Sequence, residues 1–173
     1  MESEIKALKE YGFKAYSLYE CSMDNRHYLC TVITDDLDEL FNYMRSLVKE
    51  ELREDIEEEE YGIRVSMCPL CENQDSECCE YCEDSSRFIE YVEEELTEDT
   101  LLNQDLLGSL TFVILVNGKV IEPKPFSNIK EAWDKSPLVG ALMSKLAWEA
   151  RVKSRLREIV RLTIREALKY VES

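Results

Sequence analysis

Hydrophobic and polar residues near the start of the chain predict a short helix and a β-hairpin. Apolar positions three residues apart predict a helix over residues 3–11, and Gly12 suits the position after its last turn. Strand-forming residues then fill 13–21 and 28–33. The turn-favouring segment 24–27 separates them, so we expect the two strands to pair as an antiparallel hairpin.

The next apolar residues recur at intervals of three and four, which predicts an amphipathic helix over residues 36–60. They are Leu37, Leu40, Phe41, Met44, Leu47, Val48, Leu52 and Ile56. Asp36 and Glu39 resemble an N-terminal capping pair. Four glutamates at 57–60 oppose the helix dipole, so we expect this end to fray. The glutamates form either a solvated acidic face or a site for a divalent cation or a basic partner.

The middle of the chain predicts a strand followed by helical segments. Residues 61–67 form the strand. A helix begins at Asp84 or Ser85, and one or two further helical turns follow over 101–107. The apolar residues of the first of these helices are Phe88, Ile89, Val92 and Leu96.

A second hairpin and a long helix complete the chain. The near-continuous apolar run 110–116 fits a strand that is buried on both faces. Asn117 and Gly118 predict a type I′ turn into a strand over 119–121. From Pro137 to the last residues the sequence contains no strong stop signal, so we expect one long helix.

These elements predict an α+β fold. We expect a four- to five-stranded mixed or antiparallel sheet with helices mainly on one face, a Cys-rich insert and a long C-terminal helix. Residues 1–136 would form an acidic α+β domain with the Cys-rich insert at 68–82. Residues 137–173 would form a C-terminal basic amphipathic helix.

Charge divides the chain in a similar way. The net charge is −16, of which residues 1–140 carry −20 and residues 141–173 carry +4. An acidic surface repels phosphates, so most of the chain is not expected to bind nucleic acid or an anionic membrane.

Without a membrane-spanning stretch or a signal sequence, the expected location is cytoplasmic. Only two Gln among many charged residues is typical of a thermophile, where intracellular disulfides are admissible.

Cysteines in the middle of the chain have the spacing of a metal site. Cys68-x2-Cys71 and Cys79-x2-Cys82 are separated by seven residues, and two such pairs can complete a tetrahedral, structural zinc site. Cys78 could replace Cys79 as a ligand. The segment has few large apolar side chains, so it needs zinc or two disulfides to become ordered. Reduced or redox-active thiols are the remaining alternative.

The Cys68-Pro69-Leu70-Cys71 segment also resembles the active-site turn of glutaredoxins and protein disulfide oxidoreductases, over residues 64–71. The resemblance implies thiol–disulfide exchange through Cys68 and Cys71. In that family a long helix starts within the motif, whereas an acidic polar loop follows here. A thiol–disulfide oxidoreductase is therefore an alternative function, and no family is assigned.

Two further cysteines stand in the first hairpin. Centring the hairpin between Asn25 and Arg26 sets Cys21 opposite Cys30. The pair would form either a cross-strand disulfide or two buried small apolar residues. His27, the only histidine, stands in the predicted turn without a catalytic set nearby in sequence, so we expect it at the surface.

The C-terminal helix carries basic residues at every fourth position, beside an apolar face. They are Lys153, Arg157, Arg161, Arg165 and Lys169. This basic stripe would neutralise the chain's own carboxylates or pack in a homodimer, bind an acidic protein partner, or hold nucleic-acid phosphates.

An enzyme is disfavoured, because the chain has no nucleotide-binding loop, Ser-His-Asp set or dinucleotide fingerprint. We expect a small intracellular binding or regulatory protein, stabilised by a zinc site or disulfides. It would associate with a protein partner or as a homodimer through its C-terminal helix, without a membrane. A nucleic-acid-binding protein that uses the same helix is the other alternative.

Overall fold

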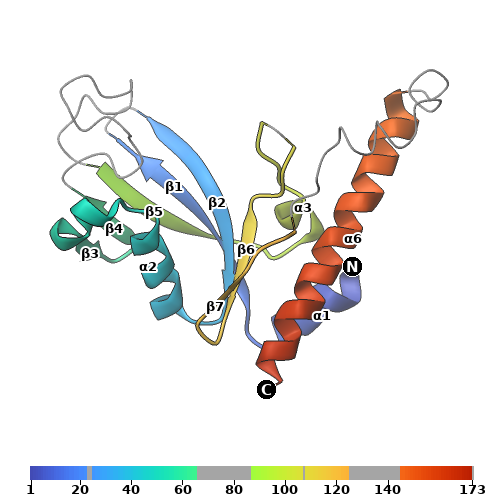
Figure 1. Cartoon of the computed structure of the whole chain (residues 1–173), viewed down its shortest axis with the longest axis horizontal. Coiled ribbons are helices and arrows are strands. Elements are labelled where there is room, and N and C mark those ends of the chain that lie inside the picture. The colour runs from blue at the N-terminus through green and yellow to red at the C-terminus, as the bar shows by residue number, and fades with distance from the viewer. Residues whose placement is uncertain (23–24, 66–86, 107, 125–144, 173) are drawn as a thin grey trace.

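The described strands belong to one curled, mixed sheet (Figure 1). The structure is a computed structural model that describes residues 1–22, 25–65, 87–106, 108–124 and 145–172, with only the backbone up to residue 151 in the last range. The strands are β1 (Lys14–Cys21), β2 (Arg26–Thr34), β3 (Glu57–Glu59), β4 (Gly62–Val65), β5 (Arg87–Glu94), β6 (Phe112–Val116) and β7 (Lys119–Ile121).

The strands are ordered β3-β4-β5-β1-β2-β6-β7, so the described sheet has seven strands and not the four to five expected. Neighbours are antiparallel except for β2 and β6, which are parallel. The strands β3 and β5 account for the difference, because the apolar pattern predicted helix for both segments.

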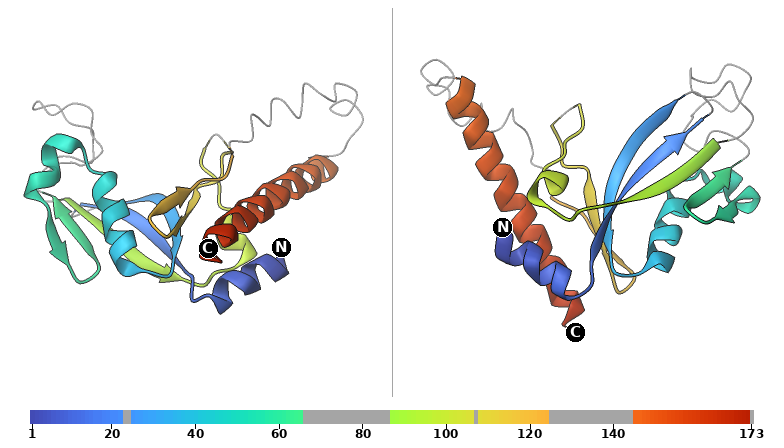
Figure 2. Two further views of the ribbon diagram at one scale, coloured as in Figure 1. Left: turned by 60° about the horizontal axis from the view of Figure 1, so that its bottom comes forward. Right: turned by 180° about the vertical axis from the view of Figure 1, so that it is seen from behind.

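Helices cover both faces of the sheet, so the expectation of helices mainly on one face is wrong (Figure 1). The helix α1 (Glu2–Glu10) and the C-terminal helix α6 (Lys145–Val171) cover one face, and the short α3 (Glu98–Leu101) lies beside them. The helix α2 (Leu37–Ser46) and the 3-10 helix η1 (Glu50–Asp55) cover the other. In Figure 2, α1 lies alongside α6 in both views.

Side chains that point alternately to the two faces of the sheet along β6 explain why each face has its own core. Phe112 and Ile114 point into the core under α1 and α6, whereas Val113 and Leu115 point into the core under α2. Each of these residues is at most 7% exposed, so the expectation of a strand buried on both faces is confirmed. Of the buried residues of α6, Val160, Ile164 and Ala167 belong to the core under α1 and α6. Leu156 and Thr163 are buried as well.

The helix predicted over 36–60 is shorter than expected. Its start is confirmed, because the Asp36 carboxylate accepts a hydrogen bond from the Asp38 amide at 2.8 Å. The α-helix ends at Ser46, after which η1 and β3 follow. Glutamates in β3 are stable in a strand because it pairs with β4, where Arg64 Nε lies 2.5 Å from the Glu59 carboxylate.

The helix predicted from residue 84 or 85 is also wrong over 87–94, which forms β5. This segment pairs with β1 on one side and β4 on the other, and it places Ile89 in the core under α2. Between β5 and β6, only residues 98–101 are helical among those that the structure describes, and the start of the predicted helical turns over 101–107 belongs to α3. The first helix, the first hairpin and the strand within 61–67 are confirmed by α1, β1–β2 and β4. Residues 137–144, where the long C-terminal helix was expected to begin, lie outside the described residues.

Candidate protein-binding site

The turn that joins β6 and β7 is fixed from both faces of the sheet. Asn117 and Gly118 have φ values of 48° and 76°, which confirms the predicted type I′ geometry. The Gly118 amide donates to Glu39 Oε1 of α2 at 2.5 Å. The Asn117 side-chain amide donates to the Tyr170 carbonyl of α6 at 2.5 Å. The hairpin is therefore tied to both helices, and a pocket lies between it and each of them.

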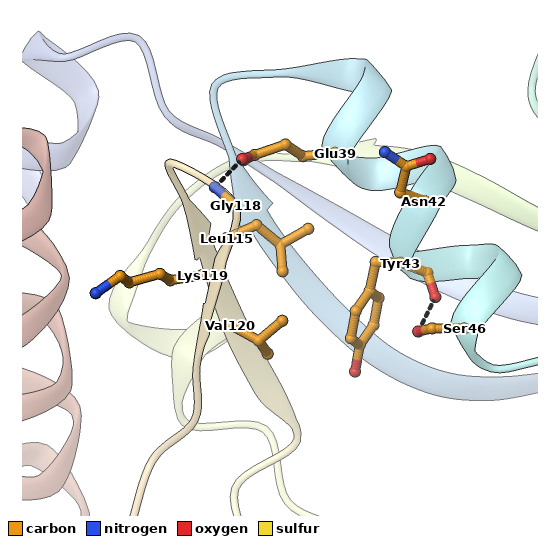
Figure 3. A pocket seen from close by; sticks show the side chains of 8 residues that line it. All are labelled: Glu39, Asn42, Tyr43, Ser46, Leu115, Gly118, Lys119 and Val120. Carbon is orange, nitrogen blue, oxygen red and sulfur yellow. Dashed lines mark hydrogen bonds between the residues drawn. The ribbon is translucent and has the colours of Figure 1, made fainter.

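The α2 pocket lies between α2 and the β6–β7 hairpin and has a volume of about 230 Å³ (Figure 3). Its lining residues are Glu39, Asn42, Tyr43, Ser46, Leu115, Gly118, Lys119 and Val120. In Figure 3, Leu115, Val120 and the ring of Tyr43 form its apolar part. Behind the pocket, the Tyr43 hydroxyl and the Cys30 thiol form a hydrogen bond, and burial raises the pKa of both groups.

The α6 pocket lies between α6 and the chain that leaves β7, and its volume is about 540 Å³. That size is within the range of sites that bind other molecules. Its lining residues are Glu122, Lys124, Ile159, Leu162, Thr163, Arg165, Glu166, Lys169 and Tyr170. Leu162 is 54% exposed, while Ile159 and Tyr170 are half-buried. Leu162 therefore belongs to a group of apolar side chains at one pocket, and such a group, unlike a single exposed leucine, favours an interaction surface.

Carboxylates of the same chain neutralise part of the predicted basic stripe. Arg157 is paired with Glu98, and Arg165 NH2 lies 3.1 Å from the Glu4 carboxylate of α1. Arg161 is half-buried between these two arginines, whereas Lys153 and Lys169 are exposed. The structure therefore supports self-neutralisation for two of the five predicted partner-binding residues, and it places Arg165 and Lys169 at the α6 pocket.

Glu4 is the most perturbed carboxylate among the described groups. It is 7% exposed, and its Oε2 accepts from the N-terminal ammonium at 2.8 Å and from the Ser3 hydroxyl at 2.9 Å. These contacts, the ammonium above all, lower the pKa of Glu4 to about 2 against the opposing effect of burial. The residue anchors Arg165 and so connects α1 to α6.

Cys21 and Cys30 do not face each other, so the predicted opposition is wrong. The turn is closed by a backbone hydrogen bond from Ser22 to Asn25 at 2.9 Å, so its centre lies two residues before the predicted one, and Cys21 pairs with Arg26. A bulge between Leu18 and Tyr19 shifts the register by one further residue, so that Cys30 pairs with Leu18. Cys30 packs on the core under α2, whereas Cys21, three positions after Leu18 on β1, lies on the other face. Both thiols are free.

Of the other predicted site residues, His27 lies within the described residues and the five cysteines of the insert lie outside them. His27 is exposed at the start of β2, as expected. The predicted metal ligands Cys68, Cys71, Cys79 and Cys82, with Cys78 as the alternative, lie outside the described residues. Within the described ranges, no three His, Cys, Asp or Glu side chains gather in a way that could hold a metal ion.

Sequence analysis missed the apolar part of the α6 pocket. The pattern of the C-terminal helix predicts one apolar face beside the basic stripe, and not a second apolar side at Ile159 and Leu162. Their signal was present, because Ile159, Leu162 and Tyr170 fall on one side of α6 that differs from its buried stripe. What the sequence could not show is that β7 and Lys124 stop short of covering that side.

None of the described helices combines the length and apolar composition needed to cross a bilayer. Comparisons with protein-family models, with curated proteins and with solved structures gave no match.

Proposed function

We propose that the chain is a non-catalytic binding protein that associates with another protein through the side of α6 that lines the α6 pocket. The observation that carries the proposal is Leu162, which is 54% exposed in the middle of a helix whose opposite stripe is fully packed. A cavity beside an exposed apolar side chain offers a partner both a place to insert and apolar area to bury.

Charge supports a protein partner. The α6 pocket brings Lys124, Arg165 and Lys169 together with Glu122 and Glu166, so both signs are present at its rim. Mixed charge around an apolar centre is typical of protein interfaces. A phosphate backbone would require a more uniformly basic surface than this pocket has.

The proposal retains a structural zinc site in the Cys-rich insert at 68–82. Its support is the spacing of Cys68, Cys71, Cys79 and Cys82 and the scarcity of apolar side chains around them. Zinc in this role holds the segment in shape and takes no part in binding chemistry.

Photo-crosslinking tests the interaction surface. A photoreactive phenylalanine analogue replaces Leu162 in the full chain, and the matched control carries it at Leu37, which is 46% exposed on α2 outside both pockets. In cell extract, position 162 should give a discrete protein adduct that excess wild-type chain suppresses and excess L162D chain does not. Adducts from 162 that match those from 37 would contradict the proposal.

A further inference from the structure

Arg161, the middle arginine of the basic stripe on α6, lacks an acceptor for its Nε–H group. Its side chain is half-buried, and the Nε atom is enclosed by the protein. Within the part of the chain that the structure describes, no oxygen accepts a hydrogen bond from this atom. A buried N–H group without an acceptor costs free energy, and the cost is greater for a charged group. An acceptor that reached Arg161 would remove this cost.

The arginines one helical turn to either side are already paired. Arg157 is paired with Glu98 of α3, and Arg165 NH2 lies 3.1 Å from the Glu4 carboxylate of α1. Glu4 also binds the N-terminal ammonium at 2.8 Å, so neither carboxylate balances the charge of Arg161. Because an arginine has five N–H donors, Arg157 and Arg165 keep donors that these contacts do not use.

We propose that Arg161 binds the phosphate group of a small ligand, with Arg157 and Arg165 supplying further donors. A spacing of four residues places the three guanidinium groups on one side of α6. A phosphate has several acceptor oxygens and fits the guanidinium fork, so one group can contact more than one arginine. A turn of the half-buried side chain that sets Nε and one terminal nitrogen on the same phosphate would give the buried N–H its acceptor.

Charge limits the ligand to one phosphate group on a small molecule. The net charge of −16 repels a polyanion such as a nucleic acid over most of the surface of the chain. At contact distance, Arg161 and the unused donors of its two neighbours offset this repulsion for a single group. A phosphate near pH 7 carries more negative charge than a carboxylate, so it gains more from the same guanidinium groups.

This site is separate from the surface of the proposed function. Arg161 does not line the α6 pocket, and it lies about 100° around the helix from Leu162. L162D, which should end the protein interaction, should therefore leave phosphate binding unchanged. Loss of one function does not decide the other.

The first experiment compares the melting temperature of the full chain in sodium phosphate and in sodium chloride at pH 7 and equal ionic strength. Phosphate stabilises many proteins without binding a specific site, so R161Q is compared with a matched variant. R155Q is that control, because it removes the same charge from an exposed position of the same helix, about 120° around its axis. Phosphate should raise the melting temperature of the wild type and R155Q equally, and that of R161Q clearly less.

The second experiment locates the phosphate by NMR of the arginine Nε–H signals. In the wild type, the Arg161 signal should shift and saturate as phosphate replaces chloride. In R161Q, the Arg157 and Arg165 signals report any remaining binding, and the Kd for phosphate should be about tenfold higher or more. R161K keeps the charge but not the fork, so its Kd should lie between those of the wild type and R161Q.

Circular dichroism shows whether each variant is folded, and the wild-type titration tests the site even if R161Q does not fold. Equal phosphate shifts of the melting temperature in wild type and R161Q would overturn the site. An Arg161 signal that phosphate does not move, or that chloride moves as much, would also overturn it. Succinate that binds as tightly as phosphate at this position would show that the site selects carboxylates, and the assignment to phosphate would be wrong.

Discussion

Glu39 of α2 and Tyr170 of α6 hold two adjacent residues of one turn from opposite faces of the sheet. The Gly118 amide donates to the Glu39 carboxylate, and the Asn117 side-chain amide donates to the Tyr170 carbonyl. Lys119, the next residue, places its ammonium 4.0 Å from the centre of the Tyr170 ring. The hairpin thus joins the two helices that line the pockets.

Replacing Glu39 tests this connection. E39A should destabilise the fold by about 1–2 kcal/mol, because it leaves the Gly118 amide without its charged acceptor. E39Q keeps a carbonyl oxygen within reach of the Gly118 amide, so its loss of folding stability should be smaller. Urea unfolding at pH 7 measures both values. Equal stability of wild type, E39Q and E39A would show that the carboxylate does not hold the turn.

The two sides of α6 should differ sharply in their effect on stability. Ile164 is 0% exposed in the core under α1, so I164A should cost about 2–5 kcal/mol. Leu162 is 54% exposed, so L162A should change stability by no more than about 0.5 kcal/mol. Chemical unfolding of the two variants under conditions where the chain is monomeric gives the comparison. A large loss in L162A would place this residue in the core and not at a binding surface.

Glu4 should give the fold a distinctive dependence on pH. Its pKa is about 2 in the folded chain against an ordinary value of 4.5, so the ionised form is favoured by folding. The resulting stability is fully present above pH 4.5 and is lost as the pH falls toward 2. E4Q should therefore destabilise the chain by about 1 kcal/mol at pH 7, where solvent screens part of the ion pair, and the difference from wild type should shrink below pH 4.5. Unfolding curves at pH 7, 5 and 3 measure the stability difference between E4Q and the wild type. A difference that stays constant with pH would contradict the prediction.

The sequence pattern correctly predicted those features whose conformation is set by adjacent residues. The β6–β7 turn is one example, because Asn117 and Gly118 both tolerate positive φ. The cap at Asp36 is another. In both cases a few adjacent residues already specify the local conformation, so a local pattern is sufficient to predict it.

Elements decided by distant contacts were predicted less well. In the segment 87–94, Ile89 and Val92 fit a helical face, while Arg87, Ile89 and Tyr91 fit one face of a strand. Pairing with β1 and β4 decides for the strand, and neither strand is close in sequence to β5. The register of the first hairpin was also missed, because its turn is closed by the backbone hydrogen bond between Ser22 and Asn25, two residues before the predicted centre, and this shift separates Cys21 from Cys30.

The candidate site was only half visible in the sequence. The spacing of Arg157 and Arg165 predicted a basic stripe, but not that Glu98 and Glu4 would neutralise it. The exposed part of the site depends on where β7 leaves the sheet, because Lys124 forms the other wall of the α6 pocket. No local sequence pattern predicts where the chain leaves β7.

The two described thiols should be unreactive. Burial, and for Cys21 also the neighbouring Glu90, raises the pKa of both Cys21 and Cys30 to about 11. At pH 8 alkylation should therefore be roughly 100-fold or more slower than for a free cysteine, because the thiolate is the reacting species. Mass spectrometry of peptides after timed alkylation measures each rate, with the urea-unfolded chain as the control. Fast labelling of Cys30, or a disulfide that links it to Cys21, would contradict the structure.

Removal of zinc should affect the Cys-rich insert and leave the sheet in place. Elemental analysis of the purified chain should find about one zinc per chain, and C68S or C82S should lower that content well below one. C21S is the matched control, because Cys21 is a free thiol in β1, and it should keep the metal. With a chelator, limited proteolysis should cut within 68–82 while far-UV circular dichroism changes little, because none of the four predicted ligands belongs to a described strand or helix. A zinc-free chain whose insert thiols all react freely with a thiol reagent would rule out the zinc site and the disulfides together.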